Sequence, residues 1–173
     1  CWRLWDEAET RALAPFDRPE ILEADLAGLA LDLAAWGVAD PAQLSWLDPP
    51  PSGAWAQAVT LLRDLEALDE DGRLTAEGRA MADLPLPPRL AHMVSRAAAE
   101  GAGRHAARIA MLLSEQGLGG RDADLRERLR QFGRDNGQRA TAARRMPDSL
   151  ARRLGDASQD IDAETTGLWL ALA

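Results

Sequence analysis

Apolar residues recur every three or four positions along much of the chain, which is the spacing of amphipathic helices. Within residues 20–36 they are Leu22, Leu26, Leu29, Leu33 and Trp36. Within residues 54–68 they are Trp55, Val59, Leu62, Leu65 and Leu68. The same period continues through four later segments that are separated by turns containing Gly or Asp: residues 88–100, 103–116, 122–134 and 137–154. The pattern predicts a mainly helical chain.

Proline-rich stops divide the predicted helices into two groups. Residues 48–51 and 84–88 contain three prolines each and cannot continue a helix. Between them, residues 69–72 (Asp-Glu-Asp-Gly) predict a turn, and residues 73–75 can form the return arm of a small hairpin. Thr75 is placed to cap the next helix. The outline is that of a small winged-helix domain with one short hairpin, followed by a helical bundle, although periodicity alone does not establish the wing.

Composition supports this all-α class. Ala and Leu account for 61 of the 173 residues and are good helix formers, whereas Val and Ile, which favour strands, together number six. These proportions exclude a β-sandwich or a large sheet. The one cysteine cannot form an internal disulfide, and no apolar run approaches the roughly 20 residues that span a bilayer. We therefore expect a cytoplasmic protein with no membrane partner.

Charge is distributed unevenly along the chain. Residues 1–88 carry 17 acidic residues and six Arg, a net charge of −11. Residues 89–155 carry seven acidic residues and 14 Arg, a net charge of +7, and the last 18 residues have a net charge of −4. This division predicts two surfaces with different partners, and the basic surface suits a polyanion.

The residues that common catalytic sites require are missing. The chain has no Lys and no G-x-x-x-x-G-K-[ST] loop, so a Walker phosphate site is excluded. The two histidines, His92 and His105, cannot form a multi-histidine metal site, and we expect both at the surface. The acid pairs at residues 122/124 and 160/162 are placed to cap helices. We predict no catalytic residue, no metal site and no cofactor in this chain.

Arginines of the basic half share faces of the predicted helices, opposite apolar residues such as Leu112 and Leu113. Side chains four positions apart lie on one helix face, and guanidinium groups match the geometry of phosphate. Few aromatic residues accompany them, so contact with the phosphate backbone is expected rather than base stacking. On this basis the candidate nucleic-acid contacts are Arg104, Arg108, Arg126, Arg130 and Arg134. The alternative, that these arginines pair with neighbouring acids or with an absent domain, stays open.

A series of short motifs occurs in a fixed order between residues 44 and 93. It comprises Leu47-Asp-Pro-Pro-Pro51, Leu65-Glu-Ala-Leu-Asp69, Gly72-Arg-Leu-Thr75 with Gly78, and Leu84-Pro-Leu-Pro-Pro-Arg-Leu90. The series closely resembles the segment after the second motor domain of DEAH-box/RHA-type helicases. Residues 33–38 and 44–48 are most similar to the bacterial HrpB branch, and residues 1–5 resemble the chain just after the arginine-finger motif. Pro87 departs from the pattern, since relatives often carry Asp or His there.

The resemblance implies an organisation and a set of partners. Residues 1–19 would be the tail of the second motor domain and a linker, residues 20–75 a winged-helix domain, residues 76–155 a ratchet-like helical bundle, and residues 156–173 the start of a truncated C-terminal region. In that family the winged helix packs on the motor domains and the bundle borders the nucleic-acid channel. The implied partners are single-stranded RNA or DNA and the motor domains of the same polypeptide. ATP and Mg are implied for the parent helicase and not for this chain.

Two other classes of function stay open. A stand-alone winged-helix regulator would need a basic recognition helix, yet Arg63 is the only basic residue in residues 20–68. A protein-interaction module would use the acidic half for docking and the arginines for structure. Salt-dependent binding to single-stranded and to duplex oligonucleotides separates these classes.

Overall fold

The computed structural model describes residues 6–13 and 16–154. More than half of these residues lie in α-helices, and the only extended pairing among them is an antiparallel bridge between Leu68 and Leu74. The prediction of a mainly helical chain is confirmed. The helices are α1 (Glu7–Ala12), α2 (Ala27–Ala35), α3 (Ser52–Asp64), α4 (Ala76–Ala82), α5 (Pro88–Ala99), α6 (Gly103–Ser114), α7 (Leu125–Arg134) and α8 (Gln138–Arg153), with 3-10 turns η1 (Glu20–Leu22) and η2 (Pro41–Gln43).

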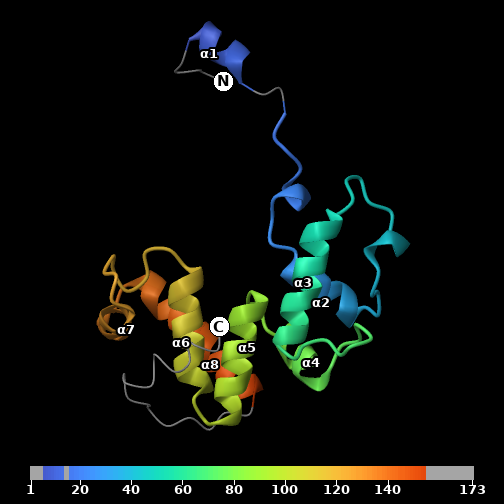
Figure 1. Cartoon of the computed structure of the whole chain (residues 1–173). Helices are drawn as coiled ribbons and strands as arrows, with labels where there is room; N and C mark the ends of the chain where they lie inside the picture. Colours follow the sequence, from blue (N-terminus) through green and yellow to red (C-terminus); the bar gives the residue numbers. More distant parts are fainter. Residues whose placement is uncertain (1–5, 14–15, 155–173) are drawn as a thin grey trace.

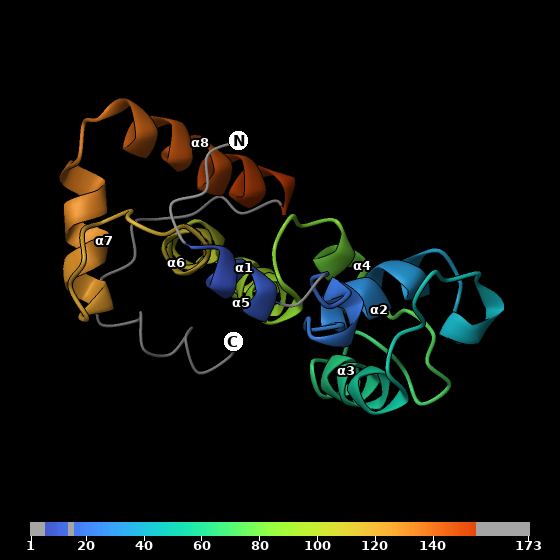
Figure 2. The same cartoon turned by 90° about the horizontal axis from the view of Figure 1, so that it is seen from above.

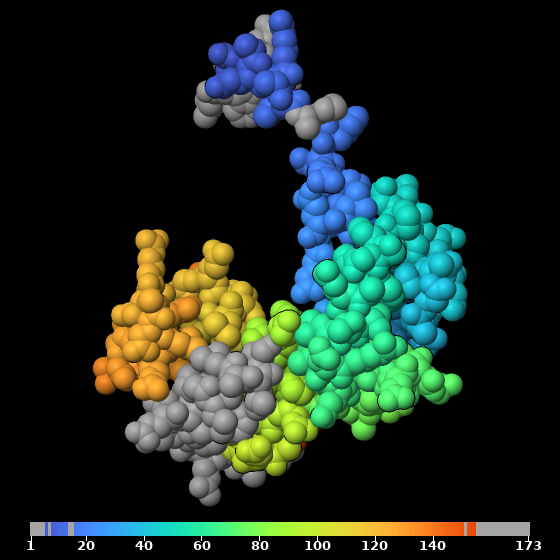
Figure 3. Space-filling view, in the orientation of Figure 1, coloured from blue at the N-terminus to red at the C-terminus, as the bar shows by residue number. Residues whose placement is uncertain are grey.

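The helices form two groups that meet at α5. Helix α2 packs on α3 and α4, and α5 contacts α2, α4 and α6. Helix α6 packs in turn on α7 and α8 (Figure 1). Seen from above, α7 lies at the end of the bundle farthest from α3 (Figure 2). Helix α1 stands away from both groups (Figure 3). The order of a winged-helix-like part followed by a bundle is the one predicted from sequence.

One apolar core extends through both groups. Its largest fully buried side chains come from α3, α4, α5 and α6 and include Leu62, Met81, Met93 and Ile109. A smaller cluster lies where α7 covers the end of α6, built from Met111, Leu112, Leu118, Phe132 and Ala140. The boundary predicted between residues 75 and 76 lies within continuous packing, because α4 contacts both α2 and α5. That boundary stays a prediction.

Local contacts account for the hairpin between α3 and α4. The Asp69 N–H donates to the Arg73 carbonyl at 2.9 Å, and the Arg73 N–H donates to the Asp69 carboxylate at 2.7 Å. Gly72 closes the turn with φ +78°. The Thr75 hydroxyl accepts from the Gly78 N–H at 3.0 Å and so caps α4. The predicted hairpin and the predicted cap are both confirmed.

Replacing Gly72 by valine is expected to destabilise the fold by on the order of 1–3 kcal/mol, because a β-branched residue resists a positive φ. A Cβ at this position meets no atom within 4 Å, so backbone strain is the only cost in the structure. Thermal melting of Gly72→Val and of Gly72→Asn measures the effect. Asparagine tolerates the left-handed region, so it should cost clearly less. Equal melting temperatures for both variants and the wild type would show that the turn does not depend on the glycine.

Two predicted helices differ from those observed. The helix expected over residues 20–36 is interrupted after η1, because the Asp25 carboxylate accepts the N–H of Ala27 at 2.8 Å and starts α2 there. The helix expected over residues 54–68 ends at Asp64, and Glu66 has φ +56°. Leu68 is buried through its bridge to Leu74 instead of through a helix face.

The surface position expected for His92 is wrong. His92 is 9% exposed, because it lies on a helix that packs against α2, α4 and α6. Arg96 on the same helix does reach solvent and pairs with Glu66 at 3.7 Å. Leu113, placed by its spacing on the apolar face of α6, is 47% exposed. Residues 1–5 and the acid pair at 160/162 lie outside the described residues.

Candidate nucleic-acid interface

A basic pocket lies where α6, α7 and α8 meet. It has a volume of about 290 Å³ and is lined by His105, Arg108, Arg126, Leu129, Arg130, Phe132, Gly133 and Arg144. Helix α6 supplies the first two residues, α7 the next five and α8 the last. In the described part of the chain, no acidic residue lines this pocket. The structure therefore brings four guanidinium groups from three helices to one concavity, which we name the arginine pocket.

Helix α7 positions its arginines through its own amphipathic pattern. Asp124 caps the helix by accepting the N–H of Arg126 at 2.8 Å, as expected for this acid. Phe132 is 1% exposed and anchors the helix in the smaller apolar cluster. Arg126 and Arg130 stand one turn apart, so both face the pocket while Phe132 lies beneath it.

Arg128 holds the loop between α6 and α7 in place. Its guanidinium donates to the carbonyls of Leu112, at 2.7 Å, and of Leu118, at 3.2 Å. Arg139 acts similarly, donating to the Gln116 carbonyl at 2.8 Å. These two arginines satisfy carbonyl groups at and beyond the end of α6 and serve the fold.

Arg144 is held in one orientation. It donates to the Phe132 carbonyl at 2.6 Å and to the Thr141 hydroxyl at 3.3 Å. Its guanidinium carbon lies 5.7 Å from the centre of the Phe132 ring, within the range of a cation–π contact. These contacts leave its positive charge uncompensated by a carboxylate in the described chain. A fixed, uncompensated guanidinium is suited to binding an anion.

The other pocket arginines differ in their partners. Arg130 forms an ion pair with Glu127 on the same helix. Neither Arg108 nor Arg126 forms a side-chain ion pair with any residue in the described part of the chain.

The five arginines selected from sequence do not form one site. Arg108, Arg126 and Arg130 line the arginine pocket. Arg104 instead pairs with Asp148 at 3.4 Å and links α6 to α8. Arg134, the last residue of α7, is exposed and does not line the pocket. Nucleic-acid binding by any of the five stays a prediction.

Sequence reasoning missed His105 and Arg144 as pocket residues. Arg144 stands one turn from Ala140, which is buried against α6 and α7, so its place on the inward side of α8 could have been read from that spacing. The meeting of α6, α7 and α8 depends on tertiary packing, which residue spacing within one helix cannot predict.

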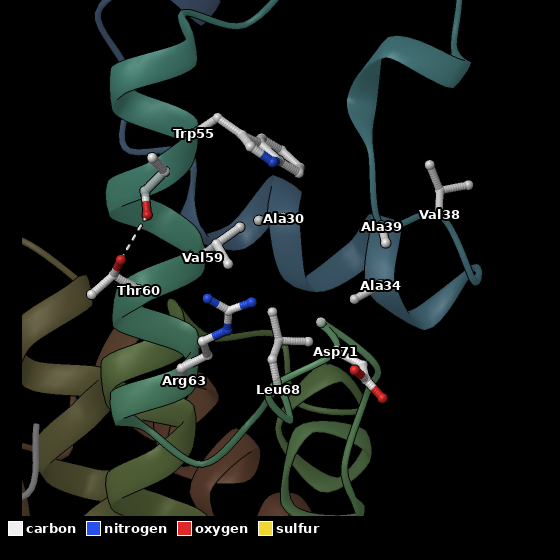
Figure 4. A pocket seen from close by; sticks show the side chains of 12 residues that line it. Ala30, Ala34, Val38, Ala39, Trp55, Val59, Thr60, Arg63, Leu68 and Asp71 are labelled. Atoms are coloured by element: carbon white, nitrogen blue, oxygen red, sulfur yellow. Dashed lines mark hydrogen bonds between the residues drawn. The ribbon is translucent and has the colours of Figure 1, made fainter.

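A second concavity lies in the winged-helix-like part (Figure 4). It has a volume of about 360 Å³ and opens between α2, α3 and the hairpin turn, with Trp55 and Val59 of α3 pointing toward Ala30 of α2. Arg63 donates to the Glu70 carbonyl at 3.0 Å and holds the turn against α3. Trp36 lines an adjoining pocket and is 79% exposed, while Leu47 is 98% exposed. This part therefore presents the apolar side chains of Trp36 and Leu47 to solvent.

No group of three or more His, Cys, Asp or Glu side chains in the described residues is placed to hold a metal ion. None of the helices in residues 6–13 and 16–154 is long and apolar enough to cross a membrane.

The chain is similar in sequence to part of several known helicases. Residues 58–86 match the family described as helicase associated domain (HA2), winged-helix. The chain is 46% identical over 109 residues to the ATP-dependent RNA helicase HrpB of Escherichia coli K12, covering 63% of this chain and 13% of that protein. It is 35% identical over 115 residues to the pre-mRNA-splicing factor ATP-dependent RNA helicase prp22 of Schizosaccharomyces pombe, covering 66% of this chain and 10% of prp22.

Solved structures agree with the sequence matches. Two crystal structures of Escherichia coli HrpB, described as a DExH-box NTPase and as a DEAH/RHA helicase, superpose with TM-scores of 0.77 and 0.80 at 34% identity. They cover 96% and 97% of this chain and 20% of each solved chain. The chain thus spans a fifth or less of the length of these relatives. By sequence and structure together, the chain corresponds to the accessory region of HrpB-like DEAH/RHA helicases, which includes the winged-helix HA2 domain.

Proposed function

We propose that this accessory region contacts the sugar-phosphate backbone of single-stranded nucleic acid in its parent helicase. The observation that carries the proposal is the convergence of Arg108, Arg126 and Arg130 on one pocket whose described lining contains no acid. Arginine forks bind phosphate oxygens through charge-assisted hydrogen bonds. HrpB and prp22 are both named as RNA helicases, which favours RNA over DNA as the strand.

The winged-helix-like half would dock on the motor domains of the same polypeptide. Trp36 and Leu47 are largely exposed, and residues 1–88 have a net charge of −11. Exposed apolar side chains grouped on one part of a protein commonly mark an interaction surface. ATP and Mg would act in the motor domains, since this chain has no Lys for a phosphate loop. A cytoplasmic location stays a prediction.

Docking predicts slower amide exchange around Trp36 and Leu47 in the parent helicase than in the isolated 173-residue chain. Burial of these side chains against another domain would reduce local opening of the backbone around them. Hydrogen exchange followed by mass spectrometry measures this, and peptides from the middle of α6 are the control because they are already buried within this chain. Identical exchange around Trp36 and Leu47 in the two proteins would contradict docking through this surface.

The double variant Arg126→Gln/Arg130→Gln tests the binding proposal. Affinity for a single-stranded oligonucleotide should fall alike for all sequences, because phosphates carry no sequence information. A plot of log affinity against log salt should flatten by roughly 0.7 per lost contact. The melting temperature should change little, since exposed arginine pairs contribute about 0–1 kcal/mol each.

The matched control is Arg121→Gln/Arg145→Gln, which removes the same charge from exposed positions that do not line the pocket. The affinity of this control variant for single strands should stay nearer to that of the wild type. If the pocket variant instead melts at a markedly lower temperature and binds normally, the arginines are structural. The protein-interaction class would then be favoured. Tighter binding to duplex than to single strand would favour the stand-alone winged-helix regulator.

A further inference from the structure

The arginine pocket holds more positive charge than one backbone phosphate can balance. Four guanidinium groups line it, from Arg108, Arg126, Arg130 and Arg144, and within residues 16–154 a carboxylate, that of Glu127, pairs with only one of them. About three positive charges remain, whereas an internal phosphodiester carries one negative charge. A terminal phosphate monoester carries about −1.5 to −2 near pH 7 and offers three acceptor oxygens.

The pocket is also organised before any ligand arrives. Arg144 is fixed by the Phe132 carbonyl and the Thr141 hydroxyl, and the Phe132 ring lies under its guanidinium. Groups that are already ordered lose less conformational entropy on binding. Leu129 and Phe132 supply an apolar wall, which strengthens the electrostatic interactions of nearby charges.

We propose that the arginine pocket binds a terminal phosphoryl group, either the phosphorylated end of a nucleic-acid strand or a small free anion such as pyrophosphate. The shared chemistry is a compact anion with more than one negative charge and three or more free oxygens. If the bound group is the end of a nucleic-acid strand, this inference rests on the proposed function. If the bound group is a free anion, it does not. The inference adds Arg144 to the proposed phosphate contacts. It also assigns the pocket a preference for terminal over internal phosphates, which strand binding alone does not imply.

Gly133 offers a way to block the pocket without changing its charge. It lines the space, and a Cβ built on it meets no atom within 4 Å. The variant Gly133→Leu should fill the pocket while leaving every arginine in place, and Gly133→Ala is its size control. A second variant, Arg144→Gln, removes the fixed charge, and Arg145→Gln is the control for charge because Arg145 is exposed and does not line the pocket.

The test measures binding of the 173-residue chain to three oligonucleotides of one sequence, ending in a 5′-phosphate, in a 3′-phosphate, or in hydroxyls at both ends. One phosphorylated strand should bind about tenfold more tightly than the hydroxyl-ended strand, as expected for charge-assisted hydrogen bonds. Inorganic pyrophosphate should remove that advantage by competition. Gly133→Leu and Arg144→Gln should each abolish it, and both controls should keep it, with circular dichroism confirming that all four variants are folded.

Equal affinity for the three strands, with no competition by pyrophosphate, would overturn this inference and leave the proposed strand contact standing. If pyrophosphate binds and Gly133→Leu blocks it while no oligonucleotide binds, the pocket is supported and the strand-binding function fails. A tenfold advantage that persists in Gly133→Leu and Arg144→Gln would place the phosphoryl site elsewhere and overturn the inference.

Discussion

Gly78→Ala is expected to destabilise the protein by about 2–4 kcal/mol, although alanine is the better helix former. A Cβ at residue 78 would lie 2.2 Å from the Ala67 carbonyl oxygen and 2.7 Å from the Leu74 side chain. The Ala67 oxygen is fixed because it accepts the Thr75 N–H at 3.0 Å. Either α4 or the hairpin must therefore move. For a chain of this size the melting temperature should fall by roughly 5–15 °C.

The matched control for this experiment is Gly28→Ala in α2, where a Cβ meets no atom within 4 Å. Helix propensity then acts alone and should raise stability by up to about 1 kcal/mol. Opposite signs at the two glycines would confirm the close approach of α4 to the hairpin. Stabilisation at both positions would show that this packing is wrong.

Gly119→Ala is the second substitution with a large expected effect, also about 2–4 kcal/mol. Gly119 has φ +67°, and a Cβ there would lie 2.4 Å from the Arg128 carbonyl oxygen. This glycine lets the loop after α6 pass close to α7. Displacing α7 would also disturb the arginine pocket, so affinity for single strands should fall together with the melting temperature.

Gly117→Ala separates strain from collision in the same loop. Gly117 has φ +81°, but its nearest atom to a built Cβ is 3.8 Å away, on the Arg139 side chain. Only backbone strain applies, at a cost of about 1–2 kcal/mol. Thermal melting and oligonucleotide binding measured on both variants test the assignment. An equal loss in the two would mean that the contact between residue 119 and α7 is not important.

The hairpin region shows how far local chemistry could be predicted. A turn at residues 69–72 and a cap at Thr75 follow from residue preferences and are found in the structure. The reason for Gly78 could not be predicted, because its neighbour Ala67 belongs to another segment and approaches only through tertiary packing. The end of α3 was also missed, since helix periodicity continues to Leu68 while the bridge to Leu74 takes that residue out of the helix.

The arginine pocket shows the limit of reasoning from single helices. Spacing identified Arg126 and Arg130 as neighbours on one face, and the structure places both in the pocket. Spacing could not reveal that Arg104 meets Asp148 on α8, because the pair joins segments more than 40 residues apart. For the same reason, spacing could not show that Arg108 on α6 and Arg144 on α8 line one pocket.

Photo-crosslinking tests the central claim most directly. A single-stranded RNA carrying photoreactive groups along its backbone is irradiated with the 173-residue chain, and the attached peptides are identified by mass spectrometry. Contact through the basic bundle predicts crosslinks in peptides that contain Arg108, Arg126–Arg130 and Arg144, with yields that fall as salt rises. Crosslinks confined to residues 20–68, or a yield indifferent to salt, would contradict the account.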